Sequence, residues 1–120
     1  MKQTTKVRIV RVDKNDEQIT LSVNVGFAQP SSTTVYVEGK ILFTNKDSFV
    51  NQPIGTKNEL FEKEVLVVTA ASDIDENTNI LDVTHILGPN IPESTVNFHD
   101  MVENREVAID ITRYIITQKL

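Results

Sequence analysis

Three oxygen-bearing side chains, Asp73, Asp75 and Asn77, alternate along a polar stretch of the sequence. Alternate residues of a loop can point toward one cation, and carboxylate and amide oxygens are the ligands that calcium prefers. The spacing does not continue as an EF-hand, because Thr78 stands where that loop needs glycine and Thr84 where it needs a bidentate glutamate. Two interpretations follow, a calcium site and a solvated acidic turn between strands, and the usual composition of loop tips favours the turn.

Three acidic turn segments, residues 13–17, 45–48 and 72–79, would lie at one end of the molecule if the strands follow an up-and-down order. That order requires residues 49–54 to form a strand. An acidic end of this kind could hold calcium or another small ligand, or attract a basic partner through its electric field. The hypothesis fails if the segment after residue 48 is irregular.

The two histidines do not form a recognisable catalytic set. His85 shares its predicted strand face with Leu81 and Leu87, which predicts a hydrogen-bonded histidine at the edge of the core. His99 is followed by Asp100, but neighbours in a strand point to opposite faces. The chain also lacks the Gly-x-Ser-x-Gly and His-Glu-x-x-His motifs, so we expect no catalytic residues.

Arg113 interrupts an apolar row formed by Ile109, Ile111 and Ile115. A charge in such a row usually marks an edge strand protected against further pairing, or a long side chain that reaches water from the rim of the core. The functional alternative is an anion clamp, because a guanidinium binds carboxylates in a forked geometry. The sequence favours the edge or rim interpretation.

The elements that would position these residues are strands. The clearest is 18–25, where Ile19, Leu21, Val23 and Val25 alternate with polar residues and predict one buried face. Residues 49–59 are either an edge strand or an irregular crossover, and 94–103 fits a strand and a short helix near 97–103 equally well. The remaining predicted strands are 6–12, 33–44 with a bend near Gly39, 60–69, 80–87 and 105–116.

Three of these strands are apolar on both sides. The run 65–68 predicts a central strand that is covered on both faces, because its four residues are consecutive and apolar. Segment 6–12 divides its apolar residues between two faces, which predicts a bulge or burial on both sides. Segment 105–116 has apolar side chains on both faces as well.

Strands rich in β-branched residues, separated by turn clusters, predict an all-β fold. We expect one domain, residues 1–120, built as an antiparallel β-sandwich of about six to eight strands that is immunoglobulin-like or transthyretin-like. A partly open β-barrel is the alternative. The 120 residues can bury a sizeable core without disulfides or metal, and the chain has no cysteine.

The composition limits the partners. With 17 acidic and 12 basic residues the net charge is -5, so this acidic protein is not expected to bind nucleic acid. The sequence shows no signal peptide and no apolar run that could span a bilayer, which leaves a cytoplasmic protein or a mature fragment of an exported one.

The pattern as a whole indicates a scaffold more clearly than a reaction. We therefore expect a non-enzymatic β-sandwich that acts through protein-protein contact, as an adaptor or as a component of a larger assembly that includes self-assembly. The alternative is a calcium- or small-ligand-binding module that uses the acidic loops, with Asp73, Asp75 and Asn77 as ligands. No other cofactor is implied.

Overall fold

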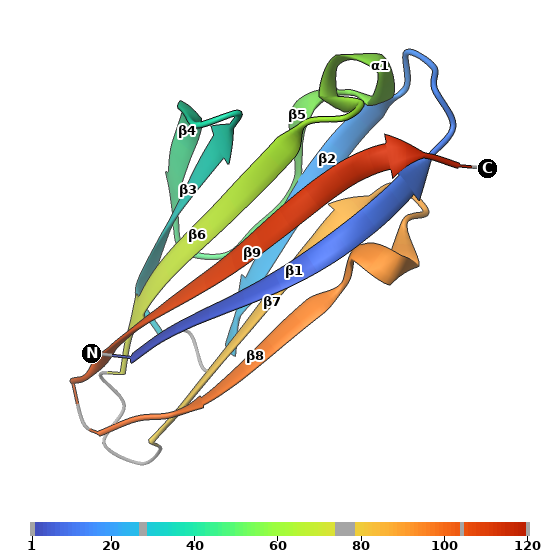
Figure 1. The fold of residues 1–120 in the computed structure, drawn as a ribbon. Helices are drawn as coiled ribbons and strands as arrows, with labels where there is room; N and C mark the ends of the chain where they lie inside the picture. The colour runs from blue at the N-terminus through green and yellow to red at the C-terminus, as the bar shows by residue number, and fades with distance from the viewer. Residues whose placement is uncertain (1, 27–28, 74–78, 104, 120) are drawn as a thin grey trace.

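The computed structural model describes residues 2–26, 29–73, 79–103 and 105–119, in which nine strands form two packed sheets (Figure 1). One sheet has the order β1-β9-β6-β3-β4 and the other β5-β2-β7-β8. The strands are β1 (Lys2–Val12), β2 (Gln18–Val25), β3 (Ser31–Val37), β4 (Lys40–Lys46), β5 (Phe49–Thr56), β6 (Glu64–Ser72), β7 (Ile80–Gly88), β8 (Val96–Met101) and β9 (Val107–Gln118).

The β-sandwich predicted from the sequence is confirmed. The two sheets have no strand in common, so the strands do not close into a barrel. Two details differ from the prediction. The described residues contain nine strands where six to eight were expected, and β1 pairs with β9 in parallel, whereas every other pair is antiparallel. The parallel pair brings together the two segments that are farthest apart in the sequence.

Strand β2 carries the predicted alternation into the core. Ile19, Leu21, Val23 and Val25 are all buried between the sheets, while the residues between them are partly or fully exposed. Most of the remaining core comes from the inward positions of β1, β3, β6, β7, β8 and β9, and Ile54 of β5 and Leu60 of α1 also belong to it. Burying each such side chain stabilises the fold by about 1.5–3 kcal/mol relative to leaving it in water.

The segment predicted as one bent strand over 33–44 is a hairpin of two strands, β3 and β4. Glu38 and Gly39 form its two-residue turn, and both have positive φ angles, 49° and 79°. Turns of this kind suit the twist of a hairpin, and glycine adopts such angles without strain. The prediction was wrong because glutamate is not a usual residue at the first turn position.

Two segments that the sequence left undecided are strands. Residues 49–56 form the edge strand β5, and a short helix, α1 (Lys57–Leu60), follows it. The helix begins with a capping box, in which Thr56 and Glu59 exchange side-chain-to-backbone hydrogen bonds. The helix proposed near 97–103 is wrong, because β8 places alternate residues in the core; a short 3-10 turn, η2 (Pro92–Ser94), precedes it.

No helix in the described ranges is long and apolar enough to cross a membrane.

Candidate functional site

Asp73, the first of the three predicted calcium ligands, follows β6 and is fully buried. One of its carboxylate oxygens accepts a hydrogen bond from the side-chain amide of Gln29 at 3.4 Å, and its backbone carbonyl accepts one from Arg105 at 2.7 Å. Asp75 and Asn77 lie outside the described residues, so the calcium site stays a prediction. Within the described ranges no three His, Cys, Asp or Glu side chains are grouped so that they could hold a metal ion.

The three acidic segments do not meet at one end of the sandwich. Segment 13–17 lies beside α1, where the backbone N–H of Lys57 donates to the carbonyl of Glu17. Asp47 lies at the opposite end, where its N–H donates to the carbonyl of Ser31 at the start of β3. The start of segment 72–79 lies at that end too, because the N–H of Ser72 donates to the carbonyl of Pro30, so two of the three segments share an end. The prediction was wrong because the hairpin between β3 and β4 adds one reversal of direction, so the later turns change ends.

His85 connects the two sheets from inside the core. It belongs to β7, and its two ring nitrogens each lie 2.8 Å from a hydroxyl of the facing sheet, Thr69 on β6 and Thr112 on β9. The Thr69 hydroxyl is also 2.8 Å from the hydroxyl of Thr33. Burial lowers the pKa of His85 to about 3, so the ring is neutral at physiological pH. The predicted hydrogen-bonded histidine is confirmed, and it lies in the core rather than at its edge.

Two carboxyl groups face each other across the interior. Asp110 on β9 is 1% exposed and Asp100 on β8 is also buried. Neither carboxyl oxygen of Asp110 has a hydrogen-bond partner within the described chain. Burial raises the pKa of Asp110 most, the nearby Asp100 carboxyl raises it as well, and Lys6 lowers it, so that the resulting pKa is about 8. The Asp110 carboxyl is therefore mostly protonated at neutral pH.

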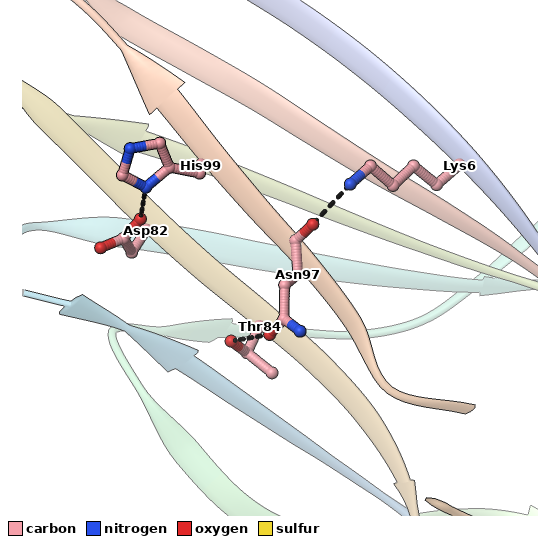
Figure 2. A network of polar contacts seen from close by, with 5 residues as sticks. All are labelled: Lys6, Asp82, Thr84, Asn97 and His99. Carbon is pink, nitrogen blue, oxygen red and sulfur yellow. Dashed lines mark hydrogen bonds and ion pairs between the residues drawn. The ribbon is translucent and has the colours of Figure 1, made fainter. Parts of the chain in front are cut away.

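A polar network lies on the outer side of the four-stranded sheet (Figure 2). His99 Nδ1 on β8 contacts a carboxylate oxygen of Asp82 on β7, and the Thr84 hydroxyl donates to the Asn97 side chain at 2.8 Å. The ammonium group of Lys6, from β1, donates to the backbone carbonyl of Asn97 and so connects the two sheets. The His99 side chain is 62% exposed, whereas Asp100 points into the core. These two neighbours therefore do not form a catalytic pair.

The outer side of the five-stranded sheet carries a continuous apolar surface, which we call the apolar face. Val7, Ile9 and Ile115 are 48%, 52% and 37% exposed on it. The strand registers place the outward residues of β1, β9 and β6 side by side, and Figure 1 shows these strands together with neither α1 nor η2 crossing them. The apolar face consists of Val7, Ile9, Leu66, Val68, Ile109, Ile111 and Ile115.

One ion pair lies within the apolar face. Arg113 on β9 donates to a carboxylate oxygen of Glu64 on β6 at 2.7 Å, and this bond raises the pKa of the guanidinium. Strand β9 lies between β1 and β6, so the prediction that Arg113 marks an edge strand is wrong. The carboxylate that the Arg113 guanidinium binds is that of Glu64 in the same chain, whereas the anion-clamp alternative needs an anion from outside.

Two hollows lie on the other sheet. Two depressions of about 240 and 330 Å³ adjoin on its outer side and share Ser22 and Ile86. Their remaining lining is neutral, from hydroxyl, amide, aliphatic and aromatic groups. A hollow without charged groups offers neither an acid nor a base for a reaction.

The sequence predicts apolar residues on both sides of β9 but not which side faces the core. The isoleucine row of this strand faces outward, and the row with Asp110 and Thr112 faces the core. The sequence signal for an exposed apolar surface is that β1, β6 and β9 each have apolar residues on both sides, although this signal does not give the orientation of β9. When strands with apolar residues on both sides are neighbours in one sheet, they predict an outer apolar surface that another element or molecule would bury.

Comparison of the chain with protein-family models, curated protein sequences and solved structures found no match.

Proposed function

We propose that this protein is a non-enzymatic β-sandwich that acts through protein-protein contact as a component of a larger assembly, with the apolar face as its contact surface. The observation that supports the proposal is the position of β1, β9 and β6. Their sequences are those of strands buried on both sides, they are neighbours in one sheet, and their outer sides meet water. Contiguous exposed apolar surface of this kind is typical of interaction sites.

The polar groups of the described residues fit a contact role better than a reaction. Catalysis needs an acid, a base or a nucleophile that converge on one cavity. His99 and Asp82 lie on an open sheet surface, and the hollows beside β2 are lined by neutral residues. His85 is held neutral between two threonine hydroxyls, which gives it a structural role.

Site-specific photo-crosslinking in cells that make this protein tests the proposed surface. A photoreactive amino acid at position 9 lies on the apolar face, and one at position 50 is a matched control, because Val50 is 76% exposed on β5 of the other sheet. We expect a discrete crosslinked species from position 9 and none from position 50. Equal crosslinking at both positions, or none at position 9, would show that the apolar face is not a contact surface.

The non-enzymatic part of the proposal has its own test. Purified protein should leave panels of ester, phosphate and glycoside substrates unchanged. Turnover that is lost in the His99→Gln variant but retained in the Asp110→Asn variant would instead place a reaction on the outer side of the four-stranded sheet.

A further inference from the structure

We propose that the apolar face is covered by a second copy of this chain, so that two five-stranded sheets pack face to face about a two-fold axis. This inference rests on the proposed contact function and names its partner. The argument depends on three properties of the face: its extent, its charge and its symmetry.

One row of large side chains continues across the whole sheet, although other outward residues of β3 and β4 are polar: Ser32, Thr34, Thr44 and Lys46. In the strand registers Val7, Arg113, Leu66, Tyr36 and Ile41 form one row that runs from β1 to β4. Ile41, at the far edge, is 66% exposed. The row therefore carries large side chains on all five strands, and only Arg113 among them is charged.

The outer side of the five-stranded sheet, with the apolar face on β1, β9 and β6 and a more polar part on β3 and β4, is close in area to what a stable dimer needs. Five strands at about 4.8 Å spacing are about 24 Å wide and nine residues are about 30 Å long, which gives a flat area of about 700 Å². A standard interface buries about 800 Å² on each partner. Sheets in sandwiches pack about 10 Å apart, so two such faces could exclude water between them as the two sheets within one chain do.

The charge of the face permits two copies to meet although each carries a net charge of -5. Strands β1, β6 and β9 are described in full, and Glu64 is the only acidic residue among their outward positions. It is already paired with Arg113. Like-charge repulsion between copies, which would oppose contact through the acidic loops, is therefore small at this face.

The ion pair also makes the face self-complementary. A two-fold interface brings the same patch of both copies together, so each charge must meet an opposite charge or none. An axis that passes between Arg113 and Glu64 places the arginine of one copy against the glutamate of the other. The two pairs would then form a four-membered network at the centre of an apolar surface, with both charges satisfied in each copy.

The first test measures mass against concentration by analytical ultracentrifugation, from about 5 to 300 µM, because association is governed by mass action. We expect the mass to rise from 13.5 kDa toward about 27 kDa, twice the chain mass. The Ile9→Lys variant should weaken association at least about tenfold, whereas Val50→Lys adds the same charge on the other sheet and should leave it unchanged. Circular dichroism and melting at low concentration show whether both variants fold.

The second test reverses one charge of the ion pair at a time, so that the Arg113–Glu64 attraction can be restored only between two different copies and not within one copy. Arg113→Glu makes the pair doubly acidic and Glu64→Arg makes it doubly basic, so each variant alone should remain monomeric. A mixture of the two should form heterodimers, because the acidic face of one then meets the basic face of the other.

The outcomes separate this inference from the function on which it rests. A natural protein that stays monomeric to the highest concentration overturns the second copy as partner, and crosslinking from position 9 to a different chain would then leave the contact function standing. Dimers that neither Ile9→Lys nor charge reversal disturbs would overturn the assignment of the face. Heterodimers from the charge-reversed mixture, together with a weakened Ile9→Lys dimer, are the expected result.

Discussion

Replacing Asp110 with asparagine should stabilise the protein, and by more as the pH rises. The side chain is buried, and its pKa is raised from 3.8 to about 8 in the folded protein. Between these values the native state holds a proton that the unfolded state has released. Between these two pKa values, each increase of one pH unit lowers the free energy of unfolding by up to about 1.4 kcal/mol. Asparagine has nearly the same size and does not titrate.

The expected magnitude follows from the two pKa values. From pH 5 to pH 7 the carboxyl contribution to the free energy of unfolding falls by about 2.5 kcal/mol. The difference in stability between the asparagine variant and the natural protein should grow by the same amount. Titrating groups that do not interact with Asp110 occur in both proteins and cancel in this difference, and a change in hydrogen bonding by the amide adds only a constant offset.

Urea unfolding followed by far-ultraviolet circular dichroism at pH 5, 6 and 7 measures this difference, at one low protein concentration so that association is constant. Asp16→Asn is the matched control, because it makes the same substitution at an exposed position in the turn beside α1. A difference for Asp110→Asn that stays within about 0.5 kcal/mol from pH 5 to pH 7 would refute the buried, protonated carboxyl.

Three further predictions concern the core and the calcium alternative. Tyr114→Phe should cost about 1 kcal/mol in urea unfolding, because the buried hydroxyl donates to the Ser94 carbonyl at 2.7 Å, whereas Tyr36→Phe on the outer side of β3 should cost little. In the Asp110→Asn background the free energy of unfolding should rise as the pH increases from about 4 to 6.5. In this range His85 is protonated in the unfolded chain but not in the folded core, where its pKa is lowered to about 3. The His85→Gln variant should flatten that rise. Millimolar calcium in place of chelator should leave the melting temperature unchanged, since Asp73 is buried beside Gln29; an increase that Asp73→Asn abolishes would support the calcium module instead.

The sandwich was predictable where one face of a strand is buried by the chain itself. In β2 the alternation of apolar and polar residues gives the strand, its inward face and its place in the core. The capping box at Thr56 and Glu59 also marks the start of α1 in the sequence, although the segment was left undecided. Local chemistry of this kind needs no knowledge of distant neighbours.

The orientation of β9 could not be predicted from hydrophobicity, because its more apolar side faces outward. Asp110 and Thr112 point inward because they meet Asp100 and His85 from the other sheet, and a single strand carries no record of such partners. The candidate surface was unpredictable for the same reason. Burial on both sides was visible in three strands, but their adjacency depends on the strand order.

The parallel pairing of β1 with β9 has a consequence for how the chain is made. Lys2 pairs beside Ala108, and β9 lies between β1 and β6, so β1 has no hydrogen-bonded strand until residues 107–118 have left the ribosome. Until then two strand edges with apolar sides stay open, which is the state in which nascent β proteins are most prone to aggregate. This sheet is therefore completed only after β9 has been made. A nascent chain stalled before β9 would lack two strands of the sheet rather than one, and chaperones should bind it there.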